Sequence, residues 1–86
     1  MKPILYYAEQ CPDTALFVAK LQTLGISYEA VEILQSLPNF KRFLKLRDSH
    51  SVFDNAKANG YVGIPALVID GEKVVLDLAE LDCIFG

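Results

Sequence analysis

The feature that most constrains this chain is a short, unbroken apolar run near its start. Residues 3–8 are Pro-Ile-Leu-Tyr-Tyr-Ala, with no charged side chain among them. A run of this length without polar alternation is typical of a β-strand that is buried on both faces. The chain has 86 residues, 52% of them hydrophobic, which suits one small globular domain. We therefore expect a single domain over residues 1–86.

A helix and a second strand are predicted directly after this run. Pro12 suits the first helical position and Asp13 suits the first turn, while Gly25 stands where a helix C-terminal glycine belongs. A helix over residues 12–24 follows. The apolar stripe of this helix consists of Phe17, Leu21 and Leu24. Residues 26–34 then alternate with a period of two, which predicts a strand. Two strands joined through a helix form a βαβ unit, so we expect them to be parallel.

The middle of the chain predicts two further helical stretches. Ser36 is a plausible N-cap for a helix over residues 37–46. The apolar stripe expected on that helix consists of Leu37, Phe40 and Leu44, with Phe43 alongside. A shorter helical stretch is predicted over residues 52–59, ending at Gly60.

The last third of the chain predicts a hairpin and a final helix. Residues 66–69 and 73–76 are apolar strands, and Asp70-Gly71 between them is a strong signal for a two-residue turn. Asp77 can then cap a helix over residues 78–85. The predicted order is β-α-β-α-β-β-α, an α/β class with a four-stranded sheet.

Charge and cysteine content exclude several classes of function. The net charge is −3, which argues against a nucleic-acid binder. No apolar run is long enough to cross a bilayer, and no export signal is visible at the N-terminus, so we expect a cytoplasmic protein. Two cysteines, Cys11 and Cys83, rule out a disulfide-dense scaffold. With one histidine they are also too few for a structural zinc site, which needs about four ligands, so we expect no metal.

Cys11 lies at a position suited to thiol chemistry. It follows the first strand and begins the first helix, at the sheet edge where sites form in open α/β sheets. The helix dipole and its free N–H groups stabilise a thiolate there, and the Thr14 hydroxyl can donate a hydrogen bond to the sulfur. The carboxylates of Glu9 and Asp13 oppose a thiolate. The other interpretation, in which Cys11 is a small buried apolar residue, stays open.

The motifs of the chain resemble those of the glutaredoxins, within the thioredoxin-like superfamily. The resemblance covers essentially the whole chain and rests on two segments, Ile4-Leu5-Tyr6-Tyr7 with Cys11-Pro12-Asp13-Thr14, and Gly63-Ile64-Pro65 with the strand and Asp70-Gly71 after it. It implies a thioredoxin-like fold, a four-stranded mixed sheet flanked by helices. It also implies that Cys11 is the nucleophile, that Pro65 is a cis-proline, and that Pro12 and the Ile64 backbone contact substrate.

Departures from the glutaredoxin pattern shape the expected chemistry. Thr14 stands where dithiol members carry the resolving cysteine, so the site is monothiol, and it is not the Cys-Gly-Phe-Ser form. Ala8 replaces the lysine that meets a glutathione carboxylate, and Val75-Leu76 replaces the family's Gly-Gly. Asp77 alone is retained as a candidate glutathione contact. Residues 43–48 are similar to a stretch in a group of glutaredoxin-related proteins.

Three other features each have a structural and a functional interpretation. Cys83 falls in the last helix, and we expect a packed helix residue rather than a disulfide partner for Cys11. His50 is expected in a solvated loop, with an acid–base role as the alternative. A basic cluster is expected to form a solvated helix face, with an anion site as the alternative. It consists of Lys41, Arg42, Lys45 and Arg47.

The sequence as a whole favours a monomeric, glutaredoxin-like, monothiol oxidoreductase. Cys11 and Thr14 are the predicted catalytic residues, and glutathione or another low-molecular-weight thiol supplies the second thiol. The expected partners are a small thiol and a thiol- or disulfide-bearing protein. Two alternatives remain: a binding or redox-sensor module with little turnover, and a dimer that holds an iron–sulfur cluster through two copies of Cys11.

Overall fold

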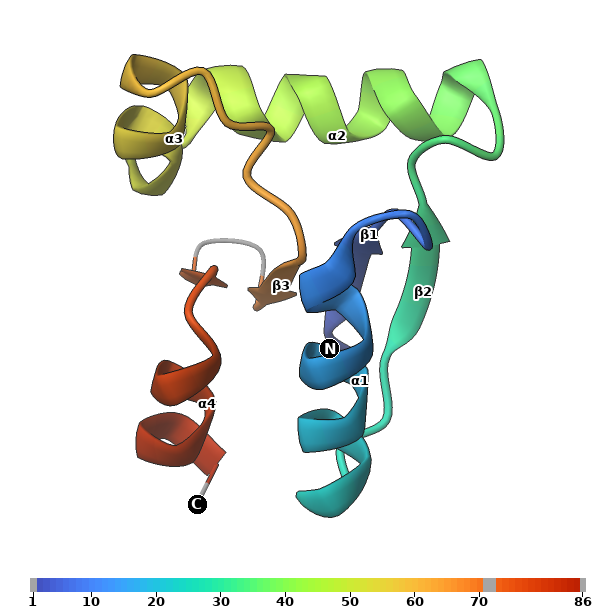
Figure 1. Ribbon diagram of the computed structural model, residues 1–86, viewed down its shortest axis with the longest axis vertical. Helices are drawn as coiled ribbons and strands as arrows, with labels where there is room; N and C mark the ends of the chain where they lie inside the picture. Colours follow the sequence, from blue (N-terminus) through green and yellow to red (C-terminus); the bar gives the residue numbers. More distant parts are fainter. Residues whose placement is uncertain (1, 71–72, 86) are drawn as a thin grey trace.

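Strands and helices alternate along the chain in the predicted order. The structure is a computed structural model that describes residues 2–70 and 73–85. Its elements are β1 (Ile4–Tyr7), α1 (Pro12–Thr23), β2 (Glu29–Glu32), α2 (Leu37–Ser49), the 3₁₀ turn η1 (Ser51–Phe53), α3 (Asp54–Ala58), β3 (Ala66–Ile69), β4 (Lys73–Val75) and α4 (Leu78–Phe85) (Figure 1).

The sheet is mixed, and β1 lies inside it. The strand order is β2-β1-β3-β4. β1 and β2 run parallel, with Ile4 opposite Glu29, whereas β3 runs antiparallel to β1 and to β4. This arrangement confirms the predicted four-stranded mixed sheet flanked by helices, and it is thioredoxin-like.

Helices cover both faces of the sheet, because neighbouring strand residues point to opposite sides. Leu5 belongs to a core cluster with residues of α1 and α4, whereas Tyr6 belongs to a second cluster with Phe43 of α2 and Phe53 of η1. Leu5 is fully buried and Tyr6 is 5% exposed, which confirms a first strand buried on both faces. Figure 1 shows the same separation, with α1 and α4 together and α2 and α3 apart from them.

The second strand and the second helix differ from prediction in extent and in orientation. Regular pairing of β2 covers residues 29–32 rather than 26–34, and α2 continues to Ser49. The predicted stripe on α2 is wrong: Leu37 is 64% exposed, while Phe43 is fully buried. The helix turns Phe43 toward the sheet, since the rings of Tyr6 and Phe53 pack on either side of it, with centroids 5.7 and 5.8 Å away.

Several local predictions at helix ends are confirmed. The Ser36 hydroxyl accepts a hydrogen bond from the backbone N–H of Asn39 at 3.3 Å, and the Asp77 carboxylate accepts one from Ala79 at 3.0 Å. The final helix runs over Leu78–Phe85 as predicted. Asp70 has a positive φ of 55°, as a tight hairpin turn requires. Gly71 lies outside the described residues, so the two-residue turn stays a prediction.

None of the helices within residues 2–70 and 73–85 has both the length and the apolar character needed to cross a membrane.

Candidate functional site

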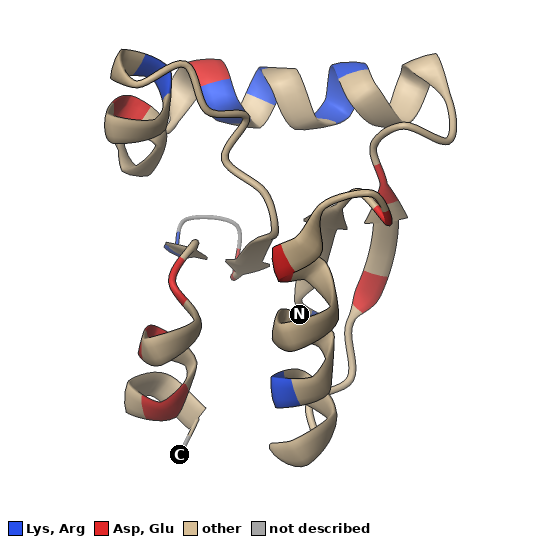
Figure 2. Cartoon of the chain, viewed as in Figure 1, with Lys and Arg blue, Asp and Glu red and all other residues tan. Residues whose placement is uncertain are grey.

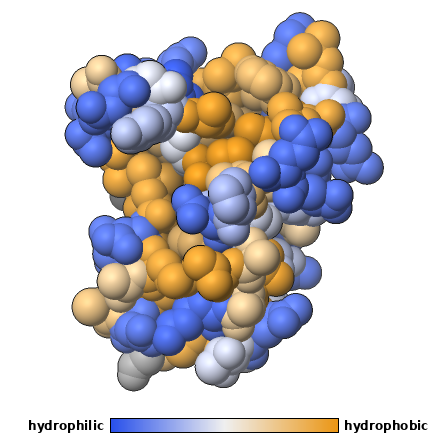
Figure 3. Space-filling model, viewed as in Figure 1, coloured by the Kyte–Doolittle hydropathy of each residue, from blue (hydrophilic) through white to orange (hydrophobic). Residues whose placement is uncertain are grey.

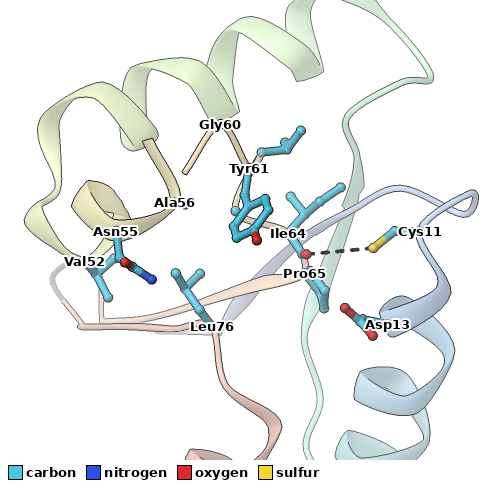
Figure 4. Close-up of a pocket in the computed structure, with 12 residues that line it drawn as sticks. Cys11, Asp13, Val52, Asn55, Ala56, Gly60, Tyr61, Ile64, Pro65 and Leu76 are labelled. Carbon is cyan, nitrogen blue, oxygen red and sulfur yellow. Dashed lines mark hydrogen bonds between the residues drawn. The ribbon is translucent and has the colours of Figure 1, made fainter. Parts of the chain in front are cut away.

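The Cys11 side chain lies at the start of α1 and faces the segment that leads into β3. Cys11 is the N-cap residue of α1, with extended backbone angles (φ −79°, ψ 122°). Its backbone N–H donates to the Ala8 carbonyl at 3.0 Å, and its Sγ lies 3.8 Å from the Ile64 carbonyl oxygen, to which the thiol donates a weak hydrogen bond (Figure 4). The side chain is partly buried, so the sulfur remains reachable.

Sheet register explains how residues 53 positions apart become neighbours. Tyr6 pairs with Ala66 across the β1–β3 ladder, so the residues just before β3 lie beside the carboxyl end of β1. The Ile64–Pro65 peptide bond is cis, as the resemblance implied. The start of α1 and the Ile64–Pro65 segment thus meet at one edge of the sheet.

A cavity of about 690 Å³ opens beside the thiol. Cys11 and Asp13 line it on one side, and Pro65 and Leu76 line its base. Its opposite wall is formed by residues 52–63, the stretch that contains α3 and the loop after it (Figure 4). The aliphatic lining consists of Val52, Ala56, Val62, Ile64, Pro65 and Leu76. This volume and apolar character are ordinary for a small-molecule or peptide site.

Two interactions hold that wall in place, and neither was predicted. The Arg47 guanidinium donates from Nε to the Val62 carbonyl at 2.8 Å and from a terminal nitrogen to the Tyr61 carbonyl at 2.6 Å. Gly63 packs so closely on Phe53 that a Cβ there would lie 2.7 Å from the ring atom Cδ1. Arg47 therefore positions the loop, rather than serving as a free member of a basic cluster.

Thr14 acts on the backbone and not on the sulfur. Its hydroxyl donates to the Ala8 carbonyl at 2.8 Å, and a hydroxyl has a single hydrogen to donate. The expected hydrogen bond from Thr14 to the Cys11 sulfur is therefore not made. Thr14 is 7% exposed and closes the turn between β1 and α1, so it orients Cys11 indirectly.

The charge around the site is acidic. Asp13 lines the main cavity and also a second one of about 380 Å³, in which Asp77 takes part. Among the described residues that line these two cavities, none is Lys, Arg or His. Pro12 is exposed at the first position of α1 and lines neither. Asp77 thus combines its capping role with a place at the edge of the site.

The remaining candidates lie elsewhere. His50 caps η1, because its Nδ1 accepts from the Val52 N–H at 3.1 Å, and it is not among the residues that line the Cys11 cavity. Cys83 is a free cysteine on α4, and the prediction that it is packed is wrong, because its side chain is exposed. Arg42 pairs with Glu29 at 3.2 Å. These contacts separate the predicted basic cluster into residues with different partners.

Metal binding has no visible basis in the described part of the chain. Within residues 2–70 and 73–85, no three His, Cys, Asp or Glu side chains are grouped so that they could hold a metal ion.

Comparison with known proteins places the chain beside one relative. It is 63% identical over 84 residues to an uncharacterized protein of Haemophilus influenzae, and the alignment covers 98% of each chain. The two proteins belong to one family. No protein-family profile and no solved structure matches the chain.

Sequence reasoning located the thiol and the proline but missed the wall that faces them. Residues 52–59 were expected as a helix, with no role in the site. The one available signal was Gly63 next to Ile64-Pro65, because a glycine before a buried strand often marks a close approach of the backbone to its neighbours. Arg47 carried no such signal, since hydrogen bonds from arginine to loop carbonyls follow no sequence spacing.

Proposed function

We propose that this protein is a monothiol thiol–disulfide oxidoreductase of the glutaredoxin-like type, with Cys11 as its nucleophile. The observation that carries the proposal is the position of the Cys11 sulfur. It is partly buried at the N-terminus of a 12-residue helix, 3.8 Å from the Ile64 carbonyl, beside an apolar cavity. The thiolate is the reactive form of a cysteine, and the partly buried sulfur faces the cavity from which a disulfide would approach.

The reaction proceeds by two thiol–disulfide exchanges. The Cys11 thiolate attacks the small-thiol sulfur of a mixed disulfide between a polypeptide cysteine and a low-molecular-weight thiol. A disulfide forms between Cys11 and the small thiol, and the polypeptide cysteine leaves as a thiolate that takes a proton from water. A second small thiol, as its thiolate, then attacks the adduct and leaves as a small-molecule disulfide, which regenerates the Cys11 thiolate. Each step breaks one S–S bond and forms another.

The second thiol in this scheme comes from solution. Thr14 occupies the place of a resolving cysteine and its hydroxyl is bonded to the Ala8 carbonyl. The other cysteine, Cys83, is exposed on α4 and lines neither cavity, and Figure 1 shows the C-terminal end of α4 away from the start of α1. Glutathione or another small thiol fills the role. A monomer in the cytoplasm, where small thiols are kept reduced, is part of the same proposal.

The backbone around Cys11 supports its role as a nucleophile. The Ala8 carbonyl accepts from the Cys11 N–H and from the Thr14 hydroxyl, so the turn that carries the sulfur is held by two hydrogen bonds. Pro12 fixes the first helical φ. A nucleophile held in one orientation loses less entropy when it reaches the transition state.

A turnover assay with matched cysteine variants tests the proposal. The substrate is a peptide whose cysteine is linked to a small thiol, and the rate of release of the free peptide thiol is measured with excess small thiol. We expect wild type to exceed Cys11→Ser by at least about a hundredfold, and Cys83→Ser to match wild type, because Cys83 lines neither of the two cavities.

Mass spectrometry separates this proposal from its main alternative. Intact wild-type protein mixed with substrate alone should gain the mass of one small thiol on Cys11. If wild type is no faster than Cys11→Ser with any small thiol and forms no adduct, the oxidoreductase proposal is wrong. A thioredoxin-fold binding or sensor module with little turnover then becomes the better interpretation.

A further inference from the structure

Two cavities adjoin one another near Cys11, which lines the larger of them but not the smaller. The cavity of about 690 Å³ lies toward α3, and the one of about 380 Å³ lies toward α4. The residues that line both cavities are Asp13, Ile64, Pro65 and Leu76. A molecule attached to the Cys11 sulfur therefore enters the larger cavity and reaches the smaller one past these shared residues.

Apolar surface continues from both cavities onto the outside of the protein. Tyr61 and Val62 border the larger cavity and are 65% and 50% exposed, while Leu16 and Leu78 border the smaller one and are 60% and 36% exposed. Figure 3 shows apolar side chains gathered in the hollow at the middle of this face. Exposed apolar side chains gathered beside a cavity are typical of an interaction site, and these four extend the apolar surface beyond the cavities.

The carboxylates that line the two cavities disfavour an anionic ligand. Asp13 contributes a carboxylate to both cavities and Asp77 one to the smaller cavity. Basic side chains nearby have other partners: Arg47 holds the loop carbonyls and Arg42 pairs with Glu29. Figure 2 shows Lys and Arg concentrated on α2, with acidic residues at the start of α1 and before α4. A cationic ligand complements this charge.

The geometry of thiol–disulfide exchange places the leaving group beside the two cavities. Attack on a disulfide is in line, and each S–S bond is about 2.05 Å, so the leaving sulfur lies about 4 Å from Cys11 Sγ. Residues on either side of a leaving cysteine then reach the two cavities. A small leaving thiol cannot cover the apolar surface beyond them.

We propose that Cys11 acts on mixed disulfides carried by a polypeptide whose cysteine has an apolar residue on one side and a basic residue on the other. The apolar side chain occupies the larger cavity, and the basic one lies between Asp13 and Asp77. This inference rests on the proposed function and adds its substrate class. Glutathione carries a net negative charge and no apolar side chain, so glutathione disulfide is a poorer substrate than a mixed disulfide on such a polypeptide.

Two peptides of equal length test the inference. Each carries one cysteine linked to 2-mercaptoethanol, a neutral thiol. Leucine and lysine flank the cysteine in one peptide, and glutamate flanks it on both sides in the other. We expect wild type to reduce the leucine–lysine peptide with a kcat/KM about tenfold higher. Because both peptides share the small thiol, their ratio isolates recognition of the polypeptide.

Charge variants then locate the recognition. Asp13→Asn and Asp77→Asn should each lower that ratio by about two- to fivefold, the range expected for one exposed charge pair. Asparagine retains the helix-capping role of Asp77. The matched control is Asp48→Asn, an exposed aspartate on α2 that lines neither cavity, and it should leave the ratio unchanged. Any effect of Asp13 on the reactivity of the Cys11 thiol changes the rates with both peptides equally, so it cancels in their ratio.

A binding measurement gives a second readout that does not need turnover. The same two peptides, with serine in place of cysteine, are titrated into wild type and into Val62→Ser. The leucine–lysine peptide should bind wild type more tightly than the glutamate peptide does, and more tightly than it binds Val62→Ser. Equal rates and equal affinities for the two peptides, or faster reduction of glutathione disulfide than of either, overturn this inference while leaving the oxidoreductase function standing. Rates that equal Cys11→Ser for every substrate instead overturn the proposed function.

Discussion

Gly63 is the position at which one added methyl group most directly tests the construction of the cavity wall. Its φ is +95°, and a Cβ built there lies 2.7 and 3.1 Å from Cδ1 and Cε1 of Phe53. Cβ atoms in folded proteins essentially never approach another atom closer than 3.0 Å. Gly63→Ala therefore forces either the loop or the Phe53 ring to move.

The ring of Phe53 has little freedom to move. It is fully buried, and the ring of Phe43 packs edge-on against it at a centroid distance of 5.8 Å. Core side chains are packed at crystal-like density, so a shift of one ring displaces the next. The loop around Gly63 is the more yielding side, and its displacement alters the wall of the cavity.

Two costs add in Gly63→Ala. A non-glycine residue at a positive φ loses about 1–2 kcal/mol, and overpacking a filled core loses about 1–3 kcal/mol. The expected loss is about 2–5 kcal/mol. At roughly 0.05–0.15 kcal/mol per residue, a domain of this length has a total stability of about 4–13 kcal/mol, so the variant approaches the limit of folding.

Gly25→Ala is the matched control, because it has the same kind of backbone angle without the contact. Gly25 has a φ of +70° and no atom within 4 Å of a built Cβ, so it loses the backbone contribution alone. Urea unfolding of both variants should show Gly63→Ala less stable than Gly25→Ala by about 1–3 kcal/mol. Equal losses would refute the reasoning, since they would mean that Phe53 accommodates the methyl group at no cost.

Two further predictions concern the loop anchor and the response to alkali. Arg47→Gln should destabilise the protein by about 1–2 kcal/mol, because two charge-assisted hydrogen bonds to the carbonyls of residues 61–62 are lost. Amide hydrogen exchange in that loop should accelerate. The control Arg42→Gln removes an exposed ion pair, so it should lose less than about 1 kcal/mol of stability and leave hydrogen exchange in the loop unchanged. Burial, followed by the carboxylate of Glu9, raises the pKa of Tyr7 above 10.0. The folded state therefore holds this proton to higher pH than the unfolded state does, and stability falls as pH rises above about 10. Urea midpoints at pH 9 and pH 11 should fall less in Tyr7→Phe, and an equal fall in both proteins would contradict this assignment.

The fold was predictable where local signals and burial agree. The boundaries of α4 follow from Asp77 as its cap, and α1 follows from Pro12 at its first turn and Gly25 after its end. The first strand has apolar residues on both faces, and the structure covers both with helices. In each case the residues of the element, or those at its ends, indicate both its boundaries and which of its faces are buried.

Prediction failed where neighbours in space, rather than in sequence, decide. The apolar positions of α2 allow more than one face to be buried, and aromatic contacts from β1 and η1 select Phe43 over Leu37. Thr14 has a sulfur and a carbonyl within possible reach, and the Ala8 carbonyl obtains its proton. Spacing along the chain cannot rank such competing partners.

The candidate site was predicted in part for the same reason. Cys11 and Ile64-Pro65 carry recognisable local patterns, and antiparallel pairing of β1 with β3 brings them together. The pattern of residues 52–59 predicts a helix, but nothing in residues 52–63 indicates that they face Cys11. Their position depends on contacts between Arg47 and Tyr61–Val62 and on the approach of Gly63 to Phe53.

The cavity wall formed by residues 52–63 can be altered separately from the turn that carries Cys11. The nucleophile is built by β1 and α1, while the opposite side of the cavity comes from a separate stretch of chain that includes no strand of the sheet. Side chains such as Val52, Asn55 and Tyr61 can therefore be exchanged without disturbing the turn that carries the sulfur. Directed evolution confined to residues 52–62, with Ala56 and Phe53 kept, offers a route to new selectivity on an unchanged reactive centre.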